Sequence, residues 1–199
     1  MAAYKEQEHE QLWHDFKKGD KAAFARIYRE HARNLINYGY KVSPDKALIE
    51  DSIQDLFCEL WQNRKNVSET TSIRFYLFKA LRYKILRNSR GNNFVDIGET
   101  AHMPEDLINI SHESYLIGIE VQSFQMTHLK DIISKLPQRQ QEAINLRYYH
   151  GFSNEEIARI MGINYQSACK FIYTALRNLK GNLQVSVTSF LFFLLFSLS

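Results

Sequence analysis

Residues 153–180 read SNEEIARIMGINYQSACKFIYTALRNLK, and their capping and turn residues predict the structure of the last third of the chain. Ser153 and Glu156 form the S-x-x-E pattern of a capping box, which marks a helix start. Gly162 follows where a tight turn needs a positive φ, and Asn164 can cap the next helix. Two helices joined by such a turn predict a helix-turn-helix, whose second helix enters the DNA major groove.

The second helix of this motif is predicted to have one apolar and one polar face. Its expected inward residues are Ala168, Ile172, Ala175, Leu176 and Leu179, and Gly181 is expected to end it. Its expected DNA contacts are Gln166, Ser167, Lys170, Tyr173, Thr174 and Arg177. Glutamine can bond adenine edges, whereas lysine and arginine bond guanine edges or phosphates. A helical hairpin with a solvated polar face is the alternative, but the caps and spacing together favour DNA binding.

Four further helices are predicted from apolar spacing and from start signals. They cover residues 20–40, a segment begun by the cap Ser43 and Pro44, residues 74–90, and a segment from Pro137 to Gly151. Eight glycines and three prolines are too few for a turn-dense β sandwich. The expected fold is therefore all-α.

The helix after Pro44 carries an unusual row of acidic residues. Asp51, Asp55 and Glu59 lie at successive i, i+4 positions, where like charges weaken an isolated helix. A function of that face, rather than the stability of the helix, would explain why the acidic residues are there. A solvated acidic stripe is an equally weighted alternative.

The helix over residues 74–90 mixes six basic residues with aromatic rings, after a polar loop at 64–73. Cations can follow phosphates while rings stack on unpaired bases, so the helix is suited to single-stranded nucleic acid. Phe75, Phe78 and Leu81 fit a core position better, and Tyr76 and Tyr83 are open to either reading. The predicted contacts are Arg74, Tyr76, Lys79, Arg82, Tyr83 and Arg87.

The charge is divided along the chain, although the formal net charge is only +3. Residues 1–93 hold 17 basic and 12 acidic side chains, residues 94–127 hold none and six, and residues 128–199 hold eight and four. Two basic ends with an acidic middle are typical of a two-part nucleic-acid binder. We therefore expect helical domains at 1–92 and 127–182, an acidic linker at 93–126 with a short helix near 114–125, and a hydrophobic tail at 183–199.

Several function classes are disfavoured. Two cysteines and seven scattered histidines give no metal-ligand spacing, and no phosphate-binding glycine loop or nucleophile motif is present. We therefore expect no catalytic residue, no metal, no cofactor and no small-molecule substrate. The amino terminus has no apolar core of a secretory signal, and the cysteine usage suits a reducing cytosol.

Three motifs, in this order, resemble the extracytoplasmic-function group of the sigma-70 family, the bacterial RNA polymerase specificity subunits. Residues 51–61 resemble region 2.2, residues 73–90 resemble regions 2.3 and 2.4, and residues 136–158 resemble region 4. The likeness covers roughly residues 10–182 and is nearest to the iron-citrate-type branch of Bacteroidetes. Cys169 and Thr174 stand where many relatives have basic residues.

The resemblance implies an initiation factor that acts in the bacterial cytoplasm. Region 2.2 would dock on the β′ clamp of core RNA polymerase through Asp51, Gln54, Asp55, Glu59 and Trp61. Regions 2.3 and 2.4, with the loop from Lys65 to Arg74, would read and melt the −10 element of promoter DNA. Region 4 would read the −35 element and meet the β flap. A membrane anti-sigma factor would be a further partner and could hold the chain near the inner membrane.

Two other functions remain open on the residues alone. A free-standing helix-turn-helix regulator would bind promoters without polymerase, but it leaves residues 46–90 unexplained. A membrane-associated adaptor would use the apolar tail, which is shorter than the roughly 20 residues that a spanning helix needs. Packing of the tail on protein is favoured over membrane contact.

Overall fold

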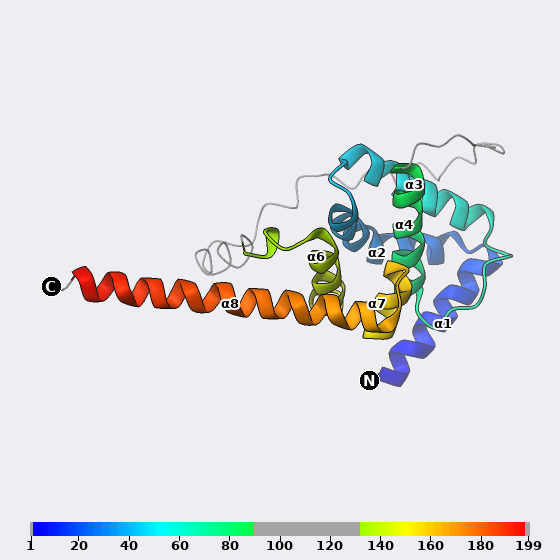
Figure 1. Ribbon diagram of the computed structural model, residues 1–199. Coiled ribbons are helices and arrows are strands. Elements are labelled where there is room, and N and C mark those ends of the chain that lie inside the picture. The colour runs from blue at the N-terminus through cyan, green and yellow to red at the C-terminus, as the bar shows by residue number, and fades with distance from the viewer. Residues whose placement is uncertain (1, 90–131, 198–199) are drawn as a thin grey trace. The chain divides into compact units, whose positions relative to one another are not determined.

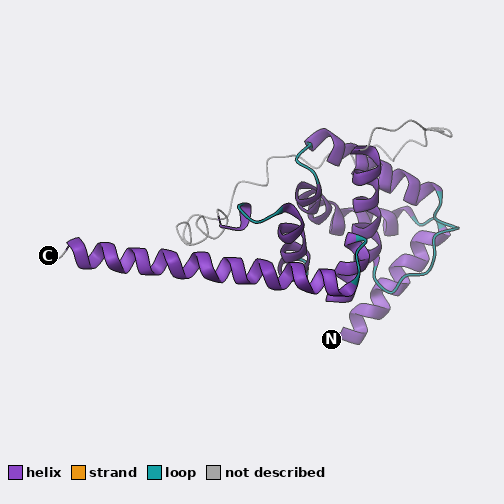
Figure 2. Cartoon of the chain, in the orientation of Figure 1, coloured by secondary structure: helices purple, strands orange, loops and turns teal. Residues whose placement is uncertain are grey.

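The computed structural model describes the backbone of residues 2–89 and 132–197, and the side chains of residues 8–89 and 132–181. The chain divides into two compact units, Met1–Ser111 and His112–Ser199. Within the described ranges every regular element is a helix (Figure 2), which confirms the all-α fold. The predicted linker, with its helix near 114–125, lies outside the described residues, so the domain boundaries there stay predictions.

The first unit is built from four helices: α1 (Ala2–Lys18), α2 (Lys21–Val42), α3 (Lys46–Gln62) and α4 (Ile73–Ser89), shown in Figure 1. Helix α4 packs against both α2 and α3. Its fully buried residues include Leu77, Phe78, Leu81 and Ile85. Phe78 and Leu81 are therefore core residues as predicted, whereas Phe75 is only partly buried.

Helix α1 contributes a part of this core that the apolar spacing did not predict. Leu12, Trp13 and Phe16 are all buried, and the Phe16 ring lies 5.9 Å from that of Phe24 on α2. The apolar residues of α1 cover little more than one turn of a polar segment, so its helical period is weak. The helical core of the first unit therefore extends back to Leu12, ahead of the first helix that the sequence predicted.

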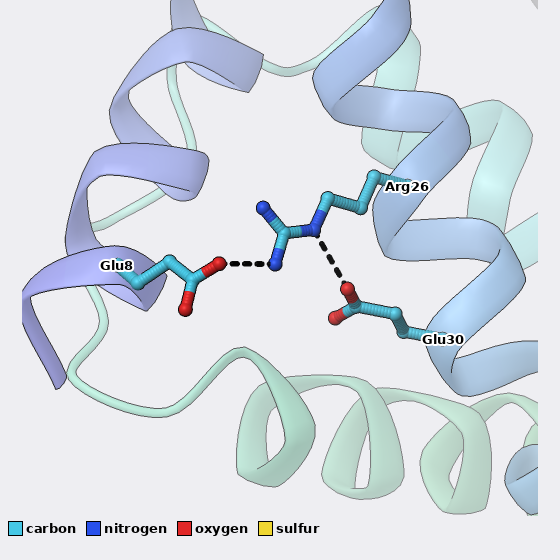
Figure 3. Close-up of polar contacts among 3 residues, drawn as sticks. All are labelled: Glu8, Arg26 and Glu30. Atoms are coloured by element: carbon cyan, nitrogen blue, oxygen red, sulfur yellow. Dashed lines mark hydrogen bonds and ion pairs between the residues drawn. The ribbon is translucent and has the colours of Figure 1, made fainter. Parts of the chain in front are cut away.

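A charged contact also ties α1 to α2 (Figure 3). The guanidinium of Arg26 donates from Nη2 to Glu8 Oε1 at 2.5 Å and from Nε to Glu30 Oε1 at 2.7 Å. Hydrogen bonds with Glu30 and Glu8 raise the pKa of Arg26 above its ordinary value. Because these groups are well exposed, the contact orients α1 more than it stabilises it.

The junction between α2 and α3 corrects the predicted helix start. Ser43 is the C-cap of α2, and Asp45 rather than Ser43 caps α3 by accepting from the Leu48 N–H at 3.1 Å. The two helices approach closely at Gly39, where an added Cβ would lie 2.5 Å from Ile49 Cγ2. Glycine is therefore required there by packing rather than by backbone conformation.

The second unit contains α6 (Gln138–Ile144), the π-helix η3 (Asn145–Tyr149), α7 (Asn154–Met161) and α8 (Tyr165–Ser197). Pro137 is the N-cap of α6, directly before its first helical residue Gln138. The backbone of α8 continues past Gly181 to Ser197, so the prediction that Gly181 ends the helix was wrong. No helix in the described parts of the chain is both long and apolar enough to span a membrane.

The core of the second unit joins the approach segment to the last helix. One cluster of buried residues consists of Ile132, Leu136, Ile144, Ala175 and Leu179. Ile157, Ile160 and Met161 of α7 are also buried, and α7 packs against α8. This core holds α8 in place from two sides.

Candidate nucleic-acid interface

The turn between α7 and α8 is built by the predicted caps. Ser153 Oγ accepts from the Glu156 N–H at 3.2 Å, and Glu156 Oε2 accepts from the Ser153 N–H at 2.8 Å. Gly162 has φ 63° and ψ 41°, the left-handed conformation that ends α7. Asn164 Oδ1 then accepts from the Ser167 N–H at 2.7 Å, which opens α8. The helix-turn-helix geometry is therefore set by local hydrogen bonds.

One side of α8 faces solvent as predicted. Gln166, Lys170, Tyr173 and Arg177 are exposed, with Tyr173 at 67%. Ser167 and Thr174 lie at the edge of this face and are partly buried. The prediction that Leu176 points inward was wrong, because 40% of its surface is exposed.

Cys169 lies at the joint between α7 and α8. Its Sγ accepts from Asn154 Nδ2 at 3.3 Å, and a hydrogen bond with Cys169 raises the pKa of Tyr165. The thiol thus takes part in the packing of the two helices. A long basic side chain at this position would replace that contact.

The basic side chains of α4 divide between surface and core. Lys79 and Arg87 are exposed, and Arg74 is partly buried. Arg82 is buried at 7% exposure, so it is not on the surface stripe that the sequence predicted. Lys84 is also buried, where its Nζ forms an ion pair with Glu59 of α3.

The two tyrosines of α4 lie in different surroundings. Tyr83 is 66% exposed, and the guanidinium of Arg87 lies 5.9 Å from the centre of its ring. Tyr76 is partly buried, and that burial raises the pKa of its hydroxyl. The ring of Tyr83 is therefore accessible from solvent, whereas the ring of Tyr76 lies partly in the core and partly at the surface.

A pocket of about 160 Å³ opens between α3 and α4. Its walls combine apolar groups, two aromatic rings and several polar ends. Its lining residues include Asn63, Val67, Tyr76, Tyr83, Lys84 and Arg87. Tyr83 and Arg87 thus form part of the wall of a hollow that has both polar and apolar groups.

The exposed side of α3 holds most of the predicted polymerase contacts. Asp51, Gln54 and Asp55 are exposed. The Glu59 carboxylate is about half exposed and holds Lys84, so it also has a structural partner.

Trp61 is different, because its ring is used for packing. It lies 5.0 Å from the Phe24 ring and beneath the Arg64 guanidinium at 4.5 Å.

No cluster of metal-ligating side chains occurs among the residues that the structure describes. The exposed side chains of Lys79, Tyr83 and Arg87 on α4 and of Gln166, Lys170, Tyr173 and Arg177 on α8 instead supply an amide, cations and phenol rings. These groups bind phosphates and base edges and stack on bases.

Two family models match the chain, one in each structural unit. The model of "Sigma-70 region 2" matches residues 27–94, and the model of "Sigma-70, region 4" matches residues 128–179. Together they cover more than half of the chain. They occur in the order that the sequence motifs predicted.

Curated relatives carry the same family name. The ECF RNA polymerase sigma factor SigL of Mycobacterium tuberculosis is 27% identical over 171 residues, which span 82% of this chain and 90% of SigL. The ECF RNA polymerase sigma factor BldN of Streptomyces coelicolor is 26% identical over 173 residues, spanning 81% of this chain and 60% of BldN.

Solved structures of similar fold include CnrH in complex with the cytosolic domain of CnrY, with a TM-score of 0.58 and 17% identity over 88% of this chain and 97% of that one. The sigma factor RpoE of Bartonella quintana, in complex with the anti-sigma factor NepR, gives a TM-score of 0.55 and 21% identity over 81% and 97%. The two matched regions, their order and the named relatives agree: the chain belongs to the sigma-70 family and is an RNA polymerase sigma factor of the extracytoplasmic-function type.

Proposed function

We propose that this sigma factor directs core RNA polymerase to two-part promoters, with α8 reading the −35 element and α4 reading and opening the −10 element. The observation that carries the proposal is that both family regions present an exposed helix face of cations and aromatic rings. Catalysis of RNA synthesis would belong to the polymerase, in the cytoplasm, and no cofactor of this chain is required.

Contact at the −35 element follows from the exposed face of α8. Gln166 stands in the first turn, where residues of a recognition helix reach base edges. Lys170 lies about one turn after Gln166, and Arg177 lies about two turns after Lys170. Both can therefore contact guanine edges or flanking phosphates. Each good base contact would give about 1–3 kcal/mol of discrimination.

Opening at the −10 element would use the exposed side of α4 and the neighbouring pocket. Separating a base from its stack costs a few kcal/mol, which favourable contacts with the freed strand must offset. Tyr83 offers a stacking surface worth about 1–3 kcal/mol per base, and Arg87 offers a cation beside it. The pocket beside them has the polar and aromatic lining that a freed base would need.

Polymerase binding is assigned to the exposed side of α3. Asp51, Gln54 and Asp55 are free of core packing, so they are the first choice for contacts with the β′ clamp. Glu59, which is about half exposed and pairs with Lys84, and Trp61, whose ring packs against Phe24, are the further proposed contacts. The β flap remains the proposed contact of region 4.

Joining two DNA-binding units in one chain strengthens binding without new contacts, because the second event becomes intramolecular. The acidic residues at 94–127 would be repelled by DNA phosphates, which favours contact through the two basic units.

An anti-sigma protein is the proposed regulator. RpoE of Bartonella quintana was solved in complex with the anti-sigma factor NepR, and CnrH was solved in complex with the cytosolic domain of CnrY. The motifs of this chain further favour the iron-citrate-type branch and an anti-sigma factor in the membrane.

Run-off transcription tests the proposal. Purified chain is mixed with core polymerase and genomic fragments, and co-migration is measured on a sizing column. The proposal predicts a stable complex and new transcripts from a subset of fragments. Tight promoter binding without polymerase, and no new transcript with it, would support the free-standing regulator instead.

A further inference from the structure

Helix α1 reaches the loop that joins α3 to α4, more than 50 residues further along the chain. The Trp13 indole N–H donates to the Ser68 carbonyl oxygen at 3.3 Å, and the Lys17 ammonium forms an ion pair with Glu69. Both contacts reach the middle of the loop. The loop thus has an attachment that is independent of α3 and α4.

The same tryptophan also touches the wall of the pocket. Its ring lies 5.4 Å from that of Tyr76, which lines the pocket together with Val67 of the loop. Trp13 is only 1% exposed, so its position is fixed by the core. A single buried side chain therefore holds both the loop backbone and an aromatic wall residue.

The two ends of the loop are held locally. The Val67 N–H donates to the Asn63 carbonyl at 3.1 Å, and the Ser72 N–H donates to Thr70 Oγ1 at 3.1 Å. Between these anchors lie Ser68 and Glu69, the two residues that α1 holds. Contacts from α1 thus complete the restraint of the loop from one end to the other.

We infer that α1 is a brace for promoter opening: Trp13 and Lys17 position the 64–72 loop and Tyr76 to receive the freed −10 strand. The inference rests on the proposed function of α4. It makes Trp13 and Lys17 positioning residues that act through the loop and make no contact with DNA. A brace that loosens would slow opening because the strand must then order the loop as it binds.

A charge exchange tests the ion pair. Lys17→Glu and Glu69→Lys are made singly and together, with Lys18→Glu as the matched control, since Lys18 is the exposed neighbour on α1. Holoenzyme with each variant is added to a promoter found by run-off transcription, with 2-aminopurine in the −10 element. The rate of the fluorescence rise reports promoter opening. Binding to a −35 duplex shows whether region 4 is unaffected, and the thermal midpoint shows whether the variant is as stable as the wild type.

We expect Lys17→Glu to slow opening by about two- to fivefold, the scale of one exposed ion pair. The double exchange should restore at least half of that loss, and Lys18→Glu should leave the rate unchanged. Affinity for the −35 duplex should not move in any variant. Trp13→Phe, which keeps a ring and loses the N–H, should slow opening by about two- to tenfold.

Opening at the wild-type rate in Lys17→Glu and in Trp13→Phe would overturn the brace. So would equal slowing in Lys18→Glu, or a double exchange no better than Lys17→Glu alone. If the wild-type holoenzyme leaves the promoter closed, the proposed function of α4 fails, and the brace fails with it.

Discussion

Removing two cations from α8 should change how −35 binding depends on salt. Lys170 and Arg177 are both exposed on the face that carries Gln166 and Tyr173, so each can neutralise a phosphate. Each phosphate contact contributes about 0.9 to the slope of log affinity against log salt. The double variant Lys170→Ala, Arg177→Ala should therefore have a slope shallower by about 1.8.

This slope converts into a difference that is simple to measure. Between about 50 and about 200 mM salt, wild-type affinity should fall about 12-fold more than the affinity of the double variant. The assay is fluorescence anisotropy of holoenzyme on a −35 duplex without a −10 element. Lys21→Ala with Lys46→Ala removes two exposed charges from the first unit and serves as the matched control.

An unchanged slope in the α8 variant would refute the placement of these two cations at the DNA. A slope that falls equally in the control would show that only overall charge matters. Circular dichroism must show that each variant is folded, because Arg177 adjoins the buried residues Ala175 and Leu179.

Three further predictions concern stability and polymerase binding. Burial lowers the pKa of His31 from 6.5 to about 4, so protons favour the unfolded chain below pH 6.5. The free energy of unfolding, measured with urea, should fall by up to about 3 kcal/mol between pH 6.5 and 4. The same fall should be smaller in His31→Leu. Gly39→Ala should cost about 1–3 kcal/mol through contact with Ile49, whereas Gly181→Ala, with open space around it, should cost nothing. Asp55→Lys should weaken co-migration with core polymerase while the melting temperature stays unchanged. Co-migration equal to that of the wild type would indicate that the acidic row is only a solvent-exposed surface.

The helix-turn-helix was predictable because its signals are local. The capping box at Ser153, the left-handed Gly162 and the cap at Asn164 each act within about four residues. The direction of the exposed residues on α8 then follows from helical period. Gly181 was wrongly predicted to end the helix. A glycine ends a helix only where the backbone leaves the helical conformation, and the backbone of α8 stays helical through Gly181.

Helix α4 could not be read in the same way. It packs against two helices, so buried residues occupy a wide arc that includes Arg82 and Lys84. Charge alone placed Arg82 among the surface contacts. The burial of both residues depends on partners far away in sequence, such as Glu59 for Lys84, 25 residues earlier.

The pocket and the proposed brace could not be predicted from the sequence either. Both depend on the path of the loop at 64–72 and on α1, whose short apolar row gave little signal. The one available hint was the spacing of Leu12, Trp13 and Phe16, which fits one helical face.

Photocrosslinking from two positions in holoenzyme on one promoter tests whether the two units bind separate promoter elements. A photoreactive amino acid replaces Tyr83 in one preparation and Tyr173 in another, since both side chains are about two-thirds exposed. If α4 and α8 bind the two elements as proposed, position 83 crosslinks to the −10 element and position 173 to the −35 element of the same template. Crosslinks from both positions to one element, or to neither, would contradict the proposal.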